Sequence, residues 1–583
     1  MLRTLTRSLR ENKGPALVTV LLSALEVVFE IVIPLFMSNL IDFGIEGGSM
    51  AAVWKFGAFL LLLAAFQLAT GVLAARIAAR ASVGFAANLR EDMYNNVQTF
   101  AFSNIDKFST ASIVTRLTTD TTNVQNAFQM LMRMAIRAPV MLIFSMIVSF
   151  RISRDISMTF LIILPILALA LFFIIRSVFP VFSRVFRTYD ELNNVVQENV
   201  RGIRVVKSFN QERHEIGKFG AISERIYKDF SKGERLITLN APLMQFCIYT
   251  CMIVISWLGA KAIIASGNDP ALGFTTGNLT ALITYTMQIL SSLMMLSMVF
   301  AMLTISLSSA RRIAEVLEER SDIPQPEQPV MTVRDGAVDF DHVSFVYASK
   351  TDKKVLDDID LHIHSGETIG IIGGTGASKS SLVQLIPRLY DVTDGKLTLG
   401  GVDVRDYDLD TLRGAVAMVL QKNELFSGTI KENLRWGNEN ATDEELRHAC
   451  ELACADGFIS AMPDGYDTHI EQGGTNVSGG QKQRLCIARA LLKKPKVLIL
   501  DDSTSAVDTR TDAQIQQSLS AYIPETTKII IAQRISSVQN ADRIVVLDDG
   551  HIDAVGCHDE LLRTCEIYRE VYESQQKGGE DDA

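Results

Sequence analysis

The chain has 583 residues, which is too many for a single hydrophobic core, so we expect at least two domains. Hydrophobic residues make up 48% of it and gather in long apolar runs before about residue 305, which excludes a wholly soluble protein. The net charge of −10 comes without a basic face, so no nucleic-acid partner is expected.

Six segments of the first half are long and apolar enough to cross a bilayer. The second and fourth connections between them are long and hold most of the lysines and arginines of this half. The positive-inside rule therefore places both termini and these two connections in the cytoplasm. The predicted transmembrane domain covers residues 1–320, with spans at about 16–41, 53–75, 134–150, 158–179, 239–264 and 279–305.

The long connections have the pattern of helices rather than coil. Apolar residues recur at helical spacing from Val195 to Phe209, and no proline occurs between Val181 and Asn240. We expect an all-α, six-helix domain whose helices continue into the cytoplasm as rigid extensions. A proline-rich stretch then marks a linker over residues 321–335, followed by an α/β domain over 336–575 and a disordered tail over 576–583.

Charged side chains occur within the predicted spans. Glu26 and Glu30 lie four residues apart on the first span, and Arg133 and Arg137 have the same spacing at the inner end of the third. Charges in such places face a partner or a cavity. Two interpretations stay open, a pairing of the carboxylates with the guanidiniums and a cavity for polar or cationic cargo.

Methionines form a stripe on the sixth span. Their polarizable, adaptable side chains suit a cavity for varied apolar substrates, but plain helix packing or lipid contact is the simpler explanation. The stripe consists of Met287, Met294, Met298 and Met302.

The stretch GGTGASKSS, Gly373 to Ser381, lies between an apolar run and an apolar helix and predicts a phosphate-binding loop. Such a loop turns backbone N–H groups toward an anion, while Lys379 can reach the β and γ phosphates and the Ser380 hydroxyl can ligate Mg²⁺. Ser378 stands where the usual spacing has a glycine, so a position that can require φ > 0 carries a Cβ.

Two further stretches add to this chemistry. Asp501 ends VLILD and would emerge at the carboxyl edge of a buried strand, where it can hold Mg²⁺ through water. Asn476–Arg484, NVSGGQKQR, places two glycines at the start of a helix, which is a second anion-binding terminus. A domain with both features can share a nucleotide between two copies.

With these motifs in this order, the chain resembles an ATP-binding cassette (ABC) half-transporter of the type I exporter family over essentially its whole length. The resemblance implies a P-loop ABC ATPase domain that hydrolyses ATP with Mg²⁺, and coupling helices within residues 110–120 and 198–209. It also implies that Tyr347 stacks on adenine, that Gln421 is the Q-loop glutamine, and that Ser505–Asp508 form the D-loop.

The implied site residues fall into three groups. Those for ATP are Tyr347, Gly373, Gly374, Thr375, Gly376, Ala377, Ser378, Lys379, Ser380, Ser381 and Gln421; those for Mg²⁺ are Ser380, Gln421 and Asp501; and the signature, which contacts ATP across a dimer, is Val477, Ser478, Gly479, Gly480 and Gln481.

Two catalytic positions depart from the family pattern. Asp502 replaces the glutamate that polarises the attacking water, and Gln533 replaces the switch histidine. The aspartate is one methylene shorter, which should slow hydrolysis about a hundredfold. A glutamine can carry neither a proton nor a positive charge.

These departures predict a heterodimer with a second half-transporter subunit that keeps the glutamate and the histidine. This chain would bind ATP at its own site and hydrolyse it slowly, and its signature would complete the partner's catalytic site. The expected function is ATP-driven export of hydrophobic or amphipathic substrates, such as drugs, lipids or peptides, across a bacterial cytoplasmic membrane. A homodimeric lipid flippase and an ATP-gated channel or regulator are the alternatives.

Overall fold

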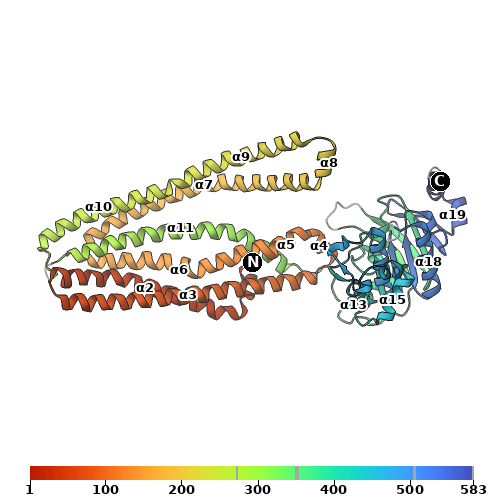
Figure 1. Cartoon of the computed structure of the whole chain (residues 1–583), viewed down its shortest axis with the longest axis horizontal. Helices are drawn as coiled ribbons and strands as arrows, with labels where there is room; N and C mark the ends of the chain where they lie inside the picture. Colours follow the sequence, from red (N-terminus) through yellow and green to blue (C-terminus); the bar gives the residue numbers. More distant parts are fainter. Residues whose placement is uncertain (271–272, 348–353, 503–506, 581–583) are drawn as a thin grey trace. The chain divides into compact units, whose positions relative to one another are not determined.

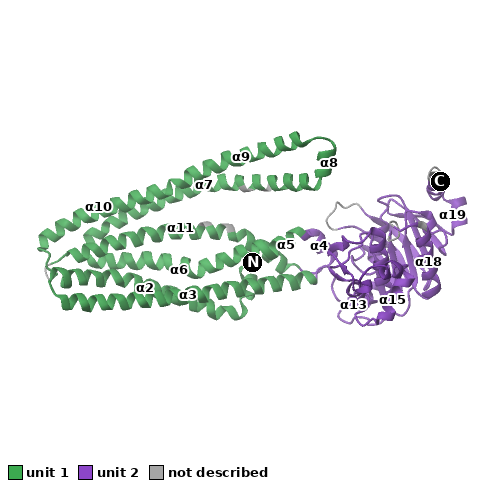
Figure 2. Ribbon diagram, viewed as in Figure 1, with its two compact units in different colours: residues 1–98, 111–319 green, residues 99–110, 320–583 purple. Residues whose placement is uncertain are grey.

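The structure, a computed structural model, describes residues 1–270, 273–347, 354–502 and 507–580. The chain forms two compact units (Figure 2). The membrane unit consists of Met1–Gln98 and Ala111–Glu319, and the C-terminal unit consists of Thr99–Thr110 and Arg320–Ala583. The sequence assigns residues 99–110 to the transmembrane domain, whereas in the structure they pack with the C-terminal unit.

Among its described residues, the membrane unit has six helices that are long and apolar enough to cross a bilayer, and each holds one predicted span. The predicted six-span, all-α architecture is therefore confirmed. The elements of this unit are α1 (Leu2–Arg7), η1 (Arg10–Asn12), α2 (Lys13–Asn39), η2 (Leu40–Glu46), α3 (Met50–Gln98), α5 (Thr110–Thr115), η3 (Arg116–Asp120), α6 (Thr121–Ile152), α7 (Arg154–Arg201), α8 (Ile203–Ser208), α9 (Glu212–Thr238), α10 (Asn240–Ser266) and α11 (Thr276–Glu318).

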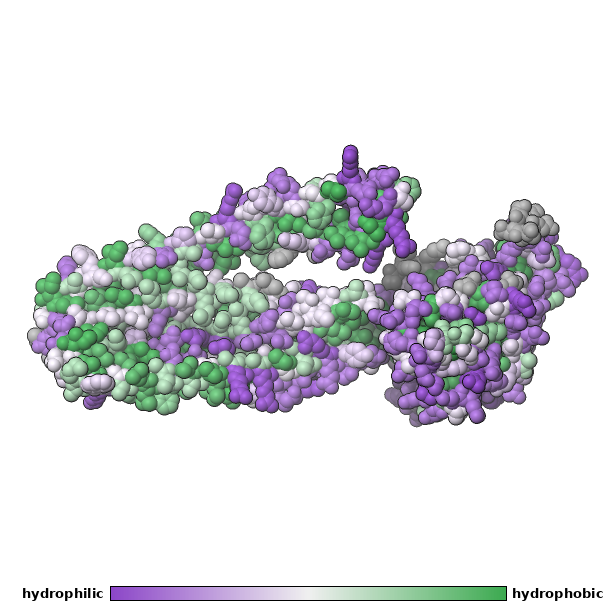
Figure 3. Space-filling view, in the orientation of Figure 1, coloured by the Kyte–Doolittle hydropathy of each residue, from purple (hydrophilic) through white to green (hydrophobic). Residues whose placement is uncertain are grey.

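Several of these helices are much longer than a bilayer is thick. α7 has 48 residues and so spans about 72 Å, against about 30 Å of hydrocarbon core. It lies beside α9, and the short α8 closes the end of the pair (Figure 1). Hydrophobic residues cover the part of the unit farthest from α8, whereas hydrophilic residues gather around α8 (Figure 3). The long connections are thus helical extensions, as the sequence predicts.

Pro34 lies inside α2 and removes one hydrogen bond from a membrane helix. Because proline has no N–H, the carbonyl of Glu30, four residues earlier, loses its helical partner. Gln288 of α11 replaces that partner by donating from Nε2 to the Glu30 carbonyl at 3.3 Å. One turn away, the buried Tyr285 donates from its hydroxyl to the Ile31 carbonyl at 2.6 Å. Side chains of α11 therefore satisfy the α2 backbone where water is excluded.

The C-terminal unit is built on two larger sheets and one small β pair. The six-stranded sheet has the order β12-β11-β3-β10-β9-β6, in which every neighbouring pair is parallel except β11 and β12. The four-stranded sheet is antiparallel with the order β2-β1-β4-β5, and β7 pairs with β8. The predicted combination of an all-α membrane domain with an α/β domain is confirmed.

The strands are β1 (Val338–Phe345), β2 (Leu356–Ile363), β3 (Thr368–Gly373), β4 (Asp394–Leu399), β5 (Val402–Asp403), β6 (Val416–Val419), β7 (Gly428–Thr429), β8 (His469–Ile470), β9 (Val497–Asp501), β10 (Thr527–Ile531), β11 (Arg543–Asp548) and β12 (His551–Gly556). The helices are α4 (Phe102–Phe108), α12 (Lys379–Leu385), η4 (Val404–Asp406), α13 (Leu409–Ala415), α14 (Ile430–Arg435), α15 (Asp443–Leu452), α16 (Asp456–Ser460), η5 (Gly465–Asp467), η6 (Gln472–Gly474), α17 (Gly479–Leu492), α18 (Thr509–Tyr522), η7 (Ile535–Ser537), α19 (His558–Thr564) and α20 (Glu566–Glu580).

The parallel strands β3, β10 and β9 end at the same edge of the six-stranded sheet. Their register places Ile531 of β10 beside Asp501 of β9 on one side and beside Ile371 of β3 on the other. Every residue of β9 and β10 is buried. The polar residues that end or follow these strands therefore emerge close together.

Two specific contacts tie α4 to the C-terminal unit. Asn104, only 1% exposed, donates from Nδ2 to the Arg320 carbonyl at 3.0 Å. The Tyr390 hydroxyl donates to Asp106 Oδ2 at 2.9 Å. These bonds explain why residues 99–110 leave the predicted transmembrane domain, although membrane helices precede and follow them in the sequence.

The end of the chain also differs from the sequence expectation. Disorder is predicted from residue 576, but α20 continues to Glu580. The glutamates, glutamines and lysine of this stretch are good helix formers, so the helix extends through two glycines before the described residues end.

Replacing Gln288 tests the repair of α2. We expect Gln288→Leu to lower the free energy of unfolding by about 1–2 kcal/mol, because the Glu30 carbonyl is left unpaired within the bilayer. In a Pro34→Ala background the N–H of residue 34 can bond the Glu30 carbonyl. Gln288→Leu should then lower the free energy of unfolding clearly less. Thermal unfolding of the four purified forms of the full chain measures this cycle, and equal costs in both backgrounds would contradict the repair.

Candidate nucleotide site

The predicted phosphate loop joins β3 to α12 and has three backbone positions with special requirements. At Gly373 a Cβ would lie 2.2 Å from the Leu547 carbonyl oxygen, so only glycine fits beside β11. Gly376 has φ +90°, and Ser378 has φ +68° and ψ +21°. The suspected φ > 0 at Ser378 is thus present, and its Cβ sits in the left-handed region that favours glycine.

Lys379 begins α12 and folds back over the loop. Its Nζ donates to the carbonyls of Gly373 and Gly374, both at 2.8 Å. Burial lowers the pKa of the Lys379 ammonium, while the carboxylates of Asp502 and Asp501 act in the opposite direction. The lysine is therefore held at the loop, and its Nζ would exchange these carbonyl acceptors for phosphate oxygens when it contacts a phosphate.

Ser380 and Asp501 link the loop to the end of β9. The Ser380 hydroxyl donates to Asp501 Oδ1 at 3.0 Å, and Asp501 is only 3% exposed. Burial raises the pKa of the Asp501 carboxyl, and the bond from Ser380 partly offsets this effect. A hydroxyl and a carboxylate side by side are oxygen ligands of the kind that Mg²⁺ prefers, so these residues fit the predicted cation.

Asp502 follows β9 and lies between two amide side chains. Its Oδ2 accepts hydrogen bonds from Gln533 Nε2 at 2.8 Å and from Gln421 Nε2 at 3.3 Å. The residue is 8% exposed and has φ +48°, an uncommon conformation for a residue with a Cβ. The structure thus brings together the two catalytic departures and the predicted Q-loop glutamine.

Gln575 of α20 holds the backbone around Gln533, which sequence patterns did not indicate. Its Oε1 accepts from the Ile535 N–H at 2.9 Å, and its Nε2 donates to the Gln533 carbonyl at 2.7 Å. The side-chain amide of Gln575 thus binds the backbone on both sides of Arg534. The bond joins residues 42 positions apart, so no local motif could have revealed it.

A cavity of about 1050 Å³ is lined by the phosphate loop, Asp501, Asp502, Gln421 and Gln533. It includes Tyr347, whose hydroxyl lies 2.9 Å from Ser381 Oγ, and it therefore holds every residue predicted for ATP and for Mg²⁺. The sequence did not indicate seven of the described residues that line it: Asp106, Lys354, Val355, Gln384, Tyr390, Ile531 and Asp549.

The predicted signature lies elsewhere on the C-terminal unit, at the start of α17. The Ser478 hydroxyl accepts from the Gln481 N–H at 3.3 Å, and Gln481 Oε1 accepts from the Ser478 N–H at 2.9 Å, which forms a capping box. Ser478 and Gly479 are exposed. None of the five signature residues, all of them within the described ranges, lines the nucleotide cavity.

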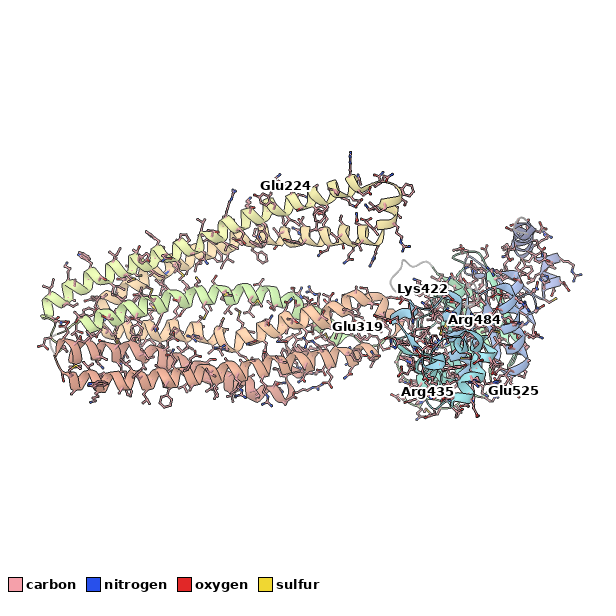
Figure 4. The ribbon with its side chains drawn as sticks, in the orientation of Figure 1. Glu224, Glu319, Lys422, Arg435, Arg484 and Glu525 are labelled. Atoms are coloured by element: carbon pink, nitrogen blue, oxygen red, sulfur yellow. The ribbon has the colours of Figure 1, made fainter. Side chains whose placement is uncertain are left out.

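The last residue of the signature stretch and the predicted D-loop lie in the same unit. Arg484 donates from Nη1 to the Cys454 carbonyl at 2.8 Å. This arginine is labelled on the C-terminal unit in Figure 4. The predicted D-loop begins at residues 505 and 506, which lie outside the described residues. Its last residue, Asp508, caps α18 by accepting from the Thr511 N–H at 2.9 Å.

The intramembrane charges pair across α2 and α6. Arg137 donates from Nη1 to Glu26 Oε1 and from Nη2 to Glu30 Oε2, both at 2.7 Å. Gly71 of α3 makes room for this cluster, because a Cβ there would lie 3.2 Å from Glu26 Oε1. Arg133 has no ion-pair partner among the described residues, so the pairing predicted from the sequence involves only one of the two arginines.

The methionine stripe of α11 faces outward from the core of the membrane unit. Met287, Met294 and Met298 are 40%, 42% and 62% exposed, and Met302 is half-buried. Packing inside this unit therefore does not account for them. A substrate cavity lined by these methionines and by the charged cluster stays a prediction.

Two family models match the chain, one described as the ABC transporter transmembrane region over residues 16–308 and the other as ABC transporter over residues 356–505. The ABC transporter ATP-binding protein YfiB of Bacillus subtilis is 35% identical over 558 residues, which cover 96% of each chain. The chain belongs to the ABC transporter family.

The transporter is also similar to the ABC transporter ATP-binding protein Rv1273c of Mycobacterium tuberculosis, with 32% identity over 580 residues that cover 99% of this chain and 98% of that one. A solved bacterial Atm1-family ABC exporter with ATP bound has the same fold, with a TM-score of 0.82 and 23% identity over 97% of this chain and 99% of that chain.

These matches, taken with the six spans and the nucleotide cavity, confirm an ATP-hydrolysing transporter that is an integral protein of the bacterial inner membrane. The C-terminal unit is its ATPase domain. As an ABC transporter it works as a dimer in the lipid bilayer.

Replacing Ser378 by glycine tests the strain in the phosphate loop. We expect Ser378→Gly to raise the free energy of unfolding by about 1 kcal/mol, because the left-handed backbone no longer carries a Cβ. ATP affinity should change less than about threefold, because the strain is present both with and without bound ATP and therefore cancels in the free energy of binding. Gly376→Ala, at φ +90°, is the matched control and should destabilise the transporter. A tenfold gain in ATP affinity for Ser378→Gly would show instead that the serine weakens binding.

Reversing charges tests the intramembrane pairing. Arg137→Glu should lower the free energy of unfolding by about 3–5 kcal/mol, because it leaves carboxylates unpaired in a partly buried cluster. Adding Glu26→Arg should restore much of the loss. Arg133→Glu, on the same helix, is the control and should cost less than about 1 kcal/mol. Thermal unfolding of the purified variants measures the cycle, and an Arg137→Glu variant as stable as the unmodified transporter would refute a stabilising pair.

Proposed function

We propose that the chain is one half of a heterodimeric exporter whose own nucleotide site binds ATP and hydrolyses it slowly. The observation that carries this proposal is the environment of Asp502, whose short carboxylate is held by the amides of Gln421 and Gln533. The partner subunit would supply the glutamate and histidine of the competent site.

The chemistry of these groups supports slow turnover. A general base must reach the proton of the attacking water within about 3 Å, and the aspartate side chain ends one methylene short of the family's glutamate. Gln533 donates one hydrogen bond to that same carboxylate, which occupies an acceptor site, and it cannot provide positive charge near a γ-phosphate. Lys379, Ser380 and Asp501 keep the groups that bind the nucleotide, and Mg²⁺ held by Ser380, Gln421 and Asp501 would neutralise phosphate charge.

The position of the signature supports a shared site. Ser478 and Gly479 are exposed at the N-terminus of α17, a helix of 14 residues, and lie outside this chain's own cavity. A helix N-terminus of this kind attracts an anion, so it can contact the nucleotide held by a second subunit. This chain would thereby complete the partner's catalytic site while its own site stays weak.

The transported substrate is proposed to be hydrophobic or amphipathic. Exposed methionines on α11 offer an adaptable apolar surface, and the cluster of Arg137 with two glutamates carries one excess negative charge. Together they would favour amphiphiles with a neutral or positive head. Export is the direction that the fold supports, through its likeness to the Atm1-family exporter.

An ATP-gated channel or regulator is the second candidate. The same Asp502 network favours it, because a site that holds ATP without rapid turnover can set a conformation by occupancy alone. ATP-dependent accumulation of a labelled amphiphile in inside-out vesicles of the host membrane would support the exporter. A passive ionic current that persists without hydrolysis would support the channel.

Restoring the catalytic pair tests the weak site. In the purified full-length chain, Asp502→Glu should raise the rate of Mg-ATP hydrolysis about a hundredfold, and adding Gln533→His should raise it further. Lys379→Ala in the double variant is the control and should return the rate to background. Rapid, substrate-stimulated hydrolysis by the unmodified chain alone would overturn the weak site and indicate a homodimer, such as a lipid flippase.

A further inference from the structure

Asp106 of α4 lines the nucleotide cavity together with Tyr347, the predicted platform for adenine. The carboxylate comes from the inserted segment 99–110, far in sequence from every nucleotide motif. Its side chain is exposed to the cavity rather than buried in the packing of α4. It therefore lies within the volume that a bound nucleotide enters.

Tyr390 connects Asp106 to the adenine platform. The two tyrosine rings meet edge to face, with centroids 5.1 Å apart and an interplanar angle of 89°, and Phe345 packs against both. The Tyr390 hydroxyl donates to Asp106 Oδ2 at 2.9 Å. Burial and the nearby Asp106 carboxylate raise the pKa of the Tyr390 phenol, so the hydroxyl stays protonated and remains the donor. The carboxylate is thereby bound to the tyrosine whose ring packs against Tyr347.

A carboxylate in a cavity for a polyanion requires an explanation. Asp501, which lines the same cavity, contacts Ser380 of the phosphate loop and fits the predicted Mg²⁺. Asp106 contacts instead Tyr390, next to the predicted adenine platform, where its charge is compatible with the uncharged part of a nucleotide. An ionised carboxylate only accepts hydrogen bonds, and each oxygen can accept more than one. The adenine base presents a donor at its exocyclic 6-amino group, whereas guanine presents an acceptor at the same position.

We propose that Asp106 accepts a hydrogen bond from the 6-amino group of adenine while the ring stacks on Tyr347. Asp106 is then a specificity-determining residue, contributed by α4, that distinguishes ATP from nucleotides without a donor at this position. The proposal rests on the assignment of the cavity to ATP, which the same measurement checks.

The test compares ATP with purine riboside 5′-triphosphate, which has the same sugar, triphosphate and ring system but lacks the 6-amino group. Equilibrium binding to the purified full-length chain is measured at low temperature, where turnover is slow. The unmodified chain should bind ATP about tenfold more tightly than the analogue, as expected for one hydrogen bond to a charged acceptor. Asp106→Leu should reduce this ratio to about one by weakening ATP binding, with the affinity for the analogue unchanged.

The matched control is Asp322→Leu, which removes another exposed carboxylate from the small cavity beside α4 but not from the nucleotide cavity. The tenfold preference should survive it. A purely structural role for Asp106 predicts that Asp106→Leu weakens ATP and the analogue equally, and that result would overturn the proposal, as would a ratio near one in the unmodified chain. Failure of the unmodified chain to bind either nucleotide would instead overturn the assignment of the cavity, and the proposal with it.

Discussion

The parallel hydrogen bonding of β3, β10 and β9 is the constraint on which the nucleotide site depends. It places the phosphate loop after β3, the Gln533 segment after β10 and the two aspartates of β9 at one edge of the sheet. The bonds from Ser380 to Asp501 and from Gln533 to Asp502 can form only in this register. A shift of β9 by a single residue would turn Asp501 toward the opposite face of the sheet.

Much of the fold was predictable because its signals are local. The six spans are continuous apolar runs. The phosphate loop, the signature and VLILD each consist of fewer than ten consecutive residues. Ser378 is an example, since the missing glycine indicated a left-handed backbone and the structure has φ +68° there. Where a motif is contiguous, its chemistry and its geometry follow from the same few residues.

Contacts between distant residues were not predictable in the same way. Arg133 and Arg137 lie on the same face of α6, one turn apart, but among the described residues only Arg137 pairs with Glu26 and Glu30, because helix packing decides which turn of α6 lies level with these carboxylates of α2. Gln288 follows no motif, although it satisfies the carbonyl freed by Pro34. Such residues are recognised only when the backbone places their partner beside them.

The inserted segment 99–110 has a consequence for how the protein is made. Its residues are synthesised more than 200 positions before Tyr390, so the bond between Asp106 and Tyr390 can form only after all six membrane spans and the first part of the ATPase domain have been synthesised. A fragment that begins at Arg320 contains every nucleotide-binding motif but lacks Asn104 and Asp106. The isolated domain is therefore incomplete, and nucleotide affinities measured on it would describe a different site.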